Sequence, residues 1–167
     1  SYAVFCLKKH TKDQMKPYLE THPDQNGEIL GWLNADDYYF PGVLDEVAAI
    51  FHRNPDIDVV YGDAVHVNDG GVFLNYFPFS QEFSANDITK SCFICQPACF
   101  FRRKAYERVG GINPFLVYTM DWDLWCKFAK MKYHFHFIDD VLSGARIYPD
   151  TKSMKGGFLD NLTKRQI

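Results

Sequence analysis

The sequence lacks several features that would assign it to common functional classes. Its 167 residues contain no apolar run approaching the roughly 20 residues that a membrane-spanning helix needs. Its formal net charge of −3 argues against a dedicated nucleic-acid binder, because such proteins carry a clear basic excess. It has no glycine-rich phosphate loop and no G-x-G-x-x-G pattern. We therefore expect no transmembrane segment and no nucleic-acid partner.

A complete set of zinc ligands is also missing from the sequence. The five cysteines include a C-x-x-C pair at Cys92 and Cys95, but no second pair follows. His134 and His136 would face the same side of a strand, and no third ligand is evident. For the cysteines, structural zinc is the alternative to the favoured interpretation, which is buried free thiols in a reducing compartment. For the histidines we favour a half-exposed strand over a metal site.

The residues that are present predict a folded domain with a sizeable core. Hydrophobic side chains make up 47% of the chain and aromatic side chains 17%. Their patterning predicts an α/β fold in which a mixed sheet is flanked by helices. The strands are expected at 4–7, 28–33, 57–61, 64–67, 72–77, 98–102, 133–138 and 141–147, with a hairpin turn at 68–71. The helices are expected at 12–20, 41–52, 84–88, 103–109 and 120–130.

An acidic turn at 34–37 is the most informative stretch. An apolar strand ends at Asn34, and two adjacent carboxylates, Asp36 and Asp37, follow it. Open α/β sheets place their ligands at this end of a strand. Two interpretations are open. These residues are ordinary turn formers, or a carboxylate holds Mg²⁺ or Mn²⁺ whose other ligands come from substrate phosphates and water.

The segment 27–37, GEILGWLNADD, resembles the Asp-x-Asp region of family-2 glycosyltransferases, which have the GT-A fold. Further segments resemble other blocks of that family, at 94–111, 120–125 and 146–153. The resemblance extends over 27–153. It leaves 1–26 as an unaligned N-terminal segment and 154–167 as a polar C-terminal tail. It implies a partial GT-A (nucleotide-diphospho-sugar transferase) fold.

The resemblance also implies which residues bind the donor. Asn34, Asp36 and Gln96 would contact a nucleotide-sugar, and Asp36 with Asp37 would hold Mn²⁺ or Mg²⁺. Asn34 stands at the first Asp position of the family motif. Tyr148 stands where many members carry a histidine near the metal.

On the acceptor side, the resemblance implies that Asp121 is the catalytic residue, acting as general base. Trp122, Asp123 and Arg146 would bind the acceptor, and Met120 replaces a glutamate of the family. The carboxylates at 121 and 123 also have a structural interpretation, because they complement the dipole of a helix that starts here. That dipole is expected to keep Asp121 ionised, as a base requires.

Taken together, the resemblance implies an inverting glycosyltransferase of polysaccharide biosynthesis. It would transfer a sugar from a nucleotide-diphosphate donor to a hydroxyl of a saccharide or lipid-linked acceptor. A complete family member has roughly a hundred residues before the matched region, and they form the nucleotide-binding half. One alternative is therefore a truncated, non-catalytic remnant that acts as a saccharide- or protein-binding module. Another is a metal-dependent hydrolase or nucleotidyltransferase. Whether the chain is active as an enzyme is left open. We expect a cytoplasmic or membrane-peripheral location and a homodimer, because an uncovered parallel sheet is rarely stable.

Overall fold

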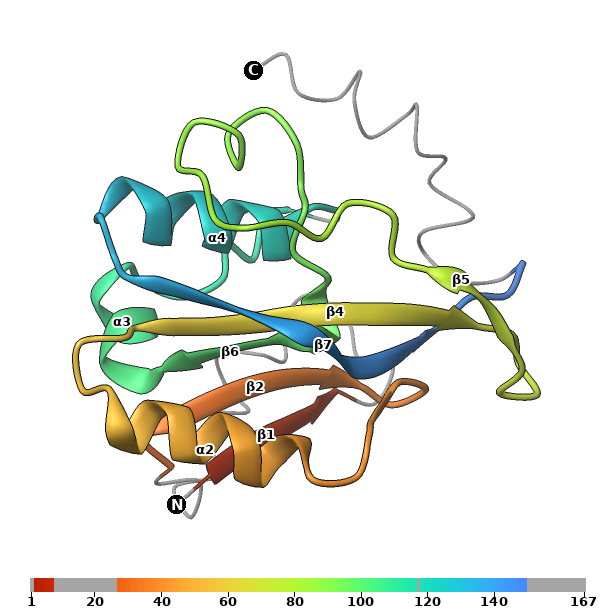
Figure 1. Ribbon diagram of the computed structural model, residues 1–167. Coiled ribbons are helices and arrows are strands. Elements are labelled where there is room, and N and C mark those ends of the chain that lie inside the picture. The colour runs from red at the N-terminus through yellow and green to blue at the C-terminus, as the bar shows by residue number, and fades with distance from the viewer. Residues whose placement is uncertain (1, 8–26, 117, 150–167) are drawn as a thin grey trace.

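The strands of the protein form one mixed sheet. The computed structural model describes residues 2–7, 27–116 and 118–149. Within these residues the sheet has seven strands in the order β1-β2-β6-β4-β7-β3, and β5 pairs with β4 (Figure 1). The strands are β1 (Tyr2–Leu7), β2 (Ile29–Asn34), β3 (Tyr38–Tyr39), β4 (Val59–Val67), β5 (Phe73–Tyr76), β6 (Cys99–Arg102) and β7 (Phe135–Arg146). The pairs β1–β2 and β4–β7 are parallel, whereas β6 is antiparallel to both β2 and β4.

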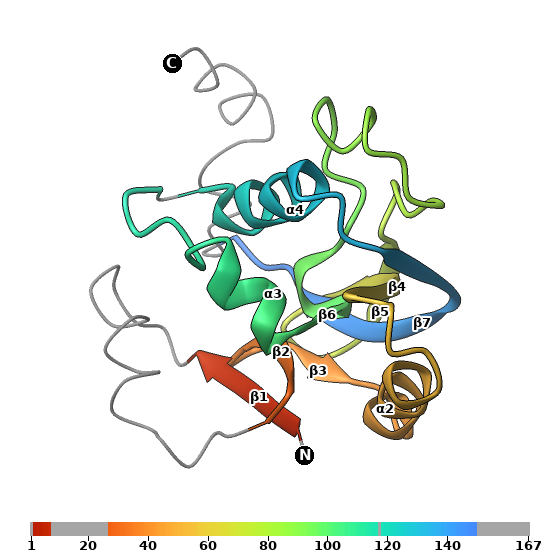
Figure 2. The same cartoon turned by 90° about the vertical axis from the view of Figure 1, so that its left-hand side faces the viewer.

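Helices cover both faces of this sheet, as Figure 2 shows. They are α2 (Val43–Arg53), α3 (Arg103–Arg108) and α4 (Met120–Lys130), with a short 3₁₀ helix η1 (Gln96–Ala98). α2 buries Val43, Val47 and Phe51 against one face, and α4 buries Leu124 and Phe128 against the other. Each set recurs every three or four residues, so one stripe of the helix is apolar. The predicted α/β fold with flanking helices is confirmed.

The strand β2 sends alternate side chains into the two cores. Leu30 packs in the core beneath α4. Gly31 faces the core beneath α2, where an added Cβ would lie 3.0 Å from the ring of Phe100. Because side chains alternate along a strand, Trp32 and Asn34 lie on the same face as Leu30, the face that α4 covers.

Two strands are longer than the sequence predicts. β4 continues through the expected break after Tyr61, and β7 is one strand where two were expected. In the pairing of the two strands, Gly62 lies opposite Ile138 and Asp63 lies opposite Val141. Asp139 and Asp140 are therefore unpaired in this ladder, and a second shift, with Ala64 opposite Ser143, leaves Leu142 unpaired before the ladder continues. The predicted interruptions were wrong because a bulge absorbs them.

Three shorter elements have different outcomes. The strand at 4–7 is confirmed as β1, and the turn at 68–71 closes with a 3.0 Å hydrogen bond from Gly71 N to Asn68 O. The helix at 84–88 is wrong, since this segment forms successive turns. The carbonyl of Ile88 accepts the indole N–H of Trp122 at 2.6 Å, which ties the segment to α4. The expected helix at 12–20 and the tail at 154–167 lie outside the described residues.

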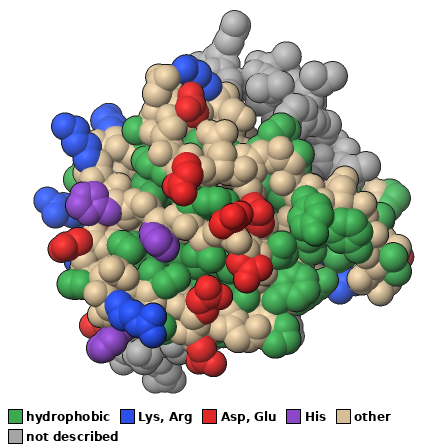
Figure 3. Space-filling model, viewed as in Figure 1, with side chains coloured by type: hydrophobic (Ala, Val, Ile, Leu, Met, Phe, Trp, Pro, Cys, Tyr) green, Lys and Arg blue, Asp and Glu red, His purple; other side chains and the backbone are tan. Residues whose placement is uncertain are grey.

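The β4–β5 hairpin presents an apolar surface. Large side chains at and beside β5 are between 41% and 63% exposed, and Figure 3 shows hydrophobic side chains gathered at this end of the molecule. They are Val72, Phe73, Leu74, Tyr76 and Phe79. Contiguous apolar surface of this kind is typical of contact regions. The homodimer expected from the sequence stays a prediction. No helix in the described ranges is long and apolar enough to cross a membrane.

Candidate functional site

A hydrogen-bonded cluster surrounds the turn at the carboxyl end of β2. The Asn34 amide donates from Nδ2 to Asp37 Oδ2 and to Gln96 Oε1, each at 2.8 Å. Gln96, the first residue of η1, donates from Nε2 to the carbonyl of Trp32. The fold thus brings Asn34 and Gln96 into contact although 62 positions separate them in the sequence.

The end of β7 closes the other side of this turn. The backbone N–H of Arg146 donates to Asp37 Oδ1 at 2.8 Å, and its Nε donates to the carbonyl of Asp36 at 2.8 Å. The same guanidinium donates to two backbone carbonyls of the β4–β5 hairpin. Tyr148 Oη donates to Asp36 Oδ2 at 2.8 Å. Arg146, an expected acceptor ligand, is therefore engaged in holding the turn against β7.

Asp37 is the more constrained of the two carboxylates. It is half-buried, and burial raises its pKa, to which the charge of Asp36 adds. Hydrogen bonds from the Arg146 N–H and the Asn34 amide act in the opposite direction. Since each oxygen of Asp37 already accepts a hydrogen bond, its main action is to fix the shape of the turn.

Asp37→Ala is expected to destabilise the protein by about 2 kcal/mol or more, because two donors lose a charged acceptor. Urea unfolding followed by circular dichroism measures this change. Asp139→Ala is the matched control. Asp139 is exposed in the β7 bulge, and surface substitutions usually change stability by less than about 0.5 kcal/mol. Equal losses in the two variants would contradict the assigned role.

The donor set allows a divalent ion at Asp36 but favours it less at Asp37. Within the described ranges, no group of three or more His, Cys, Asp or Glu side chains could hold a metal ion alone. Mg²⁺ is commonly bound by one or two carboxylates together with substrate phosphates and water, so a single carboxylate is sufficient. In the part of the chain that the structure describes, the Asp36 carboxylate accepts a single hydrogen bond, from Tyr148, and this bond engages only Oδ2. Asp36 therefore has an oxygen available for an ion.

Asp121 lies in the first turn of α4. It is half-buried, and burial raises its pKa above the ordinary value, although the backbone N–H groups of Trp122 and of Asp121 itself act to lower it. The helix dipole, which was expected to favour the ionised form of Asp121, is therefore opposed by the loss of hydration on burial. A carboxylate with a raised pKa is a stronger base once ionised.

Cys95 connects the two acidic regions. Its thiol is buried, and burial first, then the charges of Asp37 and Asp121, raise its pKa. The charges of both carboxylates therefore act on this one side chain. Because Cys95 directly precedes Gln96, the acidic turn and the start of α4 lie around the same short segment.

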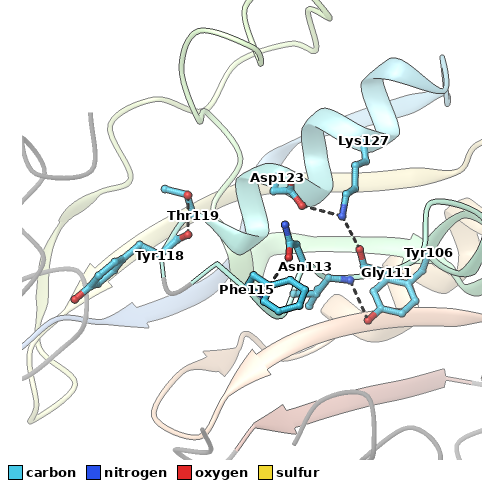
Figure 4. A network of polar contacts seen from close by, with 9 residues as sticks. Tyr106, Gly111, Asn113, Phe115, Tyr118, Thr119, Asp123 and Lys127 are labelled. Atoms are coloured by element: carbon cyan, nitrogen blue, oxygen red, sulfur yellow. Dashed lines mark hydrogen bonds and ion pairs between the residues drawn. The ribbon is translucent and has the colours of Figure 1, made fainter. Parts of the chain in front are cut away.

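The other expected acceptor residues are engaged within the protein. Figure 4 shows Asp123 paired with Lys127, at 2.8 Å between Oδ2 and Nζ. Lys127 also donates to the Gly111 carbonyl at 3.0 Å, which fastens α4 to the turn after α3. Trp122 is 8% exposed, so little of its ring is open to a sugar. The position of Asp123 favours its structural interpretation, and Trp122 is packed in the core beneath α4.

Among the described residues, no third ligand joins the C-x-x-C pair or the two histidines in a group that could hold a metal ion. Four cysteines with described side chains are free thiols, which confirms that part of the favoured interpretation: Cys92, Cys95, Cys99 and Cys126. His134 and His136 are both exposed at the start of β7, and His134 Nδ1 lies 3.1 Å from the Asp56 carbonyl.

Two contacts of the site were missed by the sequence analysis. They are the bond from Tyr148 to Asp36 and the bond from the Arg146 N–H to Asp37, which span 112 and 109 positions. The family resemblance of 146–153 placed this tail near a metal, but only the pairing of β7 shows which carboxylate each residue contacts.

The sequence of the chain is similar to those of several known proteins. No protein-family model matches the chain. An uncharacterised glycosyltransferase of Rickettsia conorii is 26% identical over an alignment of 144 residues, and the match covers 79% of this chain and 23% of that protein. A second, from Rickettsia typhi, is 24% identical over 168 aligned residues, and the match covers 86% of this chain and 51% of that protein. The O-antigen biosynthesis protein RfbC of Myxococcus xanthus is 25% identical over 141 aligned residues, and the match covers 84% of this chain and 11% of that protein.

A solved structure shares the fold. S. aureus TarS 1-349 in complex with UDP-GlcNAc superposes with a TM-score of 0.58 at 17% identity, covering 86% of this chain and 41% of that one. The comparisons confirm the resemblance to glycosyltransferases and the α/β fold. The chain spans between about a quarter and about half of the length of the two Rickettsia relatives.

Proposed function

We propose that the chain carries the acceptor-side part of an inverting glycosyltransferase that uses a nucleotide-diphosphate donor. The observation that carries this proposal is the cluster at the end of β2, which joins Asn34, Asp37 and Gln96 by hydrogen bonds and has Asp36 in the same turn. The charges of Asp37 and Asp121 both act on Cys95, next to Gln96. The glycosyltransferase relatives support the reaction class. The UDP-GlcNAc complex of TarS supports a nucleotide-sugar as the donor.

In this proposal each acidic residue has a separate task. Asp121 takes the proton of the acceptor hydroxyl as its oxygen attacks the anomeric carbon. The bond from that carbon to the diphosphate breaks, and the configuration inverts. A Mn²⁺ or Mg²⁺ ion held by Asp36 would offset the charge of the leaving diphosphate. Asp37 and Arg146 keep the turn in place, and Asn34 and Gln96 orient the donor.

Calorimetric titration with UDP and GDP sugars, with Mn²⁺ or with EDTA, tests the proposal. Binding of one nucleotide-sugar is expected, at least about tenfold tighter with the ion than without it. A protein that binds no nucleotide-sugar under either condition would overturn the proposal. Binding of a saccharide without any turnover would instead favour the non-catalytic binding module.

A further inference from the structure

Trp32 carries a buried hydrogen-bond donor that has no acceptor within the described part of the chain. The side chain is 6% exposed, and its indole Nε1 finds no acceptor among the residues that the structure describes. Buried indole N–H groups usually have a partner, so an orphaned one calls for an explanation. A bound ligand would supply the missing acceptor.

The position of Trp32 relates this donor to the candidate site. It lies two residues before Asn34, on the same face of β2, the face that α4 covers. In the pairing with β6, Gly31 lies opposite Phe100, so the next residue of β2 lies beside Cys99. The pKa of the Cys99 thiol is raised by burial and then by neighbouring groups that include Asp121. Trp32 thus lies next to the 34–37 turn, on the face of β2 that α4 covers, and its carbonyl accepts a hydrogen bond from Gln96.

The other two tryptophans are differently placed. Trp122 donates its indole N–H to the Ile88 carbonyl at 2.6 Å. Trp125 also lacks an acceptor within the described ranges, but it is fully buried against the rings of Phe101 and Phe128, at 5.8 and 6.0 Å. Trp32 therefore carries an unpaired indole N–H beside the candidate site, and Trp125 carries one in the core.

We infer that Trp32 donates its indole N–H to an oxygen of the sugar bound between the 34–37 turn and Asp121. Trp32 is then a specificity-determining residue, since it recognises the sugar and not the nucleotide. This inference rests on the proposed function and adds a residue that reads the donor sugar.

Nuclear magnetic resonance of ¹⁵N-labelled protein tests the contact directly. The three tryptophans give three indole signals, which single Trp→Phe variants assign. Saturation with UDP-GlcNAc and Mg²⁺, which is diamagnetic, is expected to move the Trp32 indole proton downfield, whereas UDP with Mg²⁺ leaves it in place. The Trp125 signal should not move with either ligand. A Trp32 signal that is unchanged by saturating UDP-GlcNAc would overturn the inference. If Trp32→Phe does not fold, the variants of the other two tryptophans still assign its signal.

Affinities provide the second readout. Trp32→Phe is expected to weaken binding of UDP-GlcNAc about fivefold and to leave binding of UDP unchanged, since one hydrogen bond to the sugar is lost. Trp125→Phe, which removes the same group in the core, should change neither affinity. Equal weakening of UDP and UDP-GlcNAc by Trp32→Phe would show a structural role and overturn the inference. If Trp32→Phe binds both ligands as tightly as the unaltered protein does, the role of Trp32 is refuted and the proposed function is not. If the unaltered protein binds no nucleotide-sugar, the proposed function fails and the inference fails with it.

Discussion

Asp121→Asn is expected to lower turnover by about 10²–10⁴-fold, the usual contribution of a general base. Asparagine keeps the size and most hydrogen bonds of the side chain but cannot accept the proton of the acceptor hydroxyl. Donor binding should stay within about a factor of two, because the residue acts on the acceptor and not on the diphosphate. Release of UDP from a nucleotide-sugar in the presence of acceptor measures turnover. Asp139→Asn removes an exposed carboxylate of β7 and should retain full activity.

The same variant is expected to be more stable than the unaltered protein near neutral pH. The pKa of Asp121 is raised by burial in the folded state, so the folded protein binds this proton more tightly than the unfolded chain does. Stability therefore falls as pH rises from the ordinary carboxyl value of 3.8 through the raised value. The asparagine variant does not have this loss. Its advantage should be absent at lower pH and fully present above the raised pKa, as measured by thermal unfolding across pH.

Lower stability of Asp121→Asn at neutral pH would contradict this account of the site. A gain in stability together with lost turnover would show that the inactivity does not come from misfolding. It would also fit a common property of active sites, in which a catalytic group is kept in an environment that destabilises the folded protein. Loss of donor binding in this variant would place Asp121 on the donor side and contradict its role as base.

Periodic patterns made the fold predictable. The apolar stripes of α2 and α4 and the apolar run of β2 are local properties of the sequence, and the structure has these elements within two residues of their predicted bounds. The continuous strand β7 was not predictable in this way. Its bulge depends on how it pairs with β4, which is a property of two distant segments.

The candidate site likewise has one part that is local in the sequence and one part that depends on distant segments. The sequence placed Asn34, Asp36 and Asp37 in one turn, because they are neighbours in the chain. The resemblance implied that both carboxylates are metal ligands, and the structure gives each of them different hydrogen-bond partners. Asp37 accepts a hydrogen bond from the backbone N–H of Arg146, the last residue of β7, and Asp36 accepts one from Tyr148, two residues later. The raised pKa of Asp121 was not predictable for a similar reason, since a helix start is visible in the sequence and burial is not.

Asp36→Ala is expected to weaken binding of the nucleotide-sugar in Mn²⁺ by at least about tenfold and to remove the difference between Mn²⁺ and EDTA. The reason is that Asp36 has an available oxygen, whereas both oxygens of Asp37 already accept hydrogen bonds. Calorimetric titration of the same nucleotide-sugar with each metal condition measures the effect. Asp139→Ala is again the control, and it should bind as the unaltered protein does.

Stability distinguishes this loss from a collapse of the turn. The Asp36 carboxylate accepts one hydrogen bond, from Tyr148, so Asp36→Ala should cost no more than about 1.5 kcal/mol of stability. Asp37→Ala should cost more stability, because both oxygens of Asp37 accept hydrogen bonds, and it should weaken binding by deforming the turn. Tyr148→Phe keeps the Asp36 carboxylate and removes only its donor, so Mn²⁺ should still strengthen binding in that variant. If Asp36→Ala still binds the nucleotide-sugar more tightly with Mn²⁺ than with EDTA, the ion does not bind at Asp36. In that case the turn at the end of β2 would act on the donor through hydrogen bonds from Asn34 and Gln96 alone.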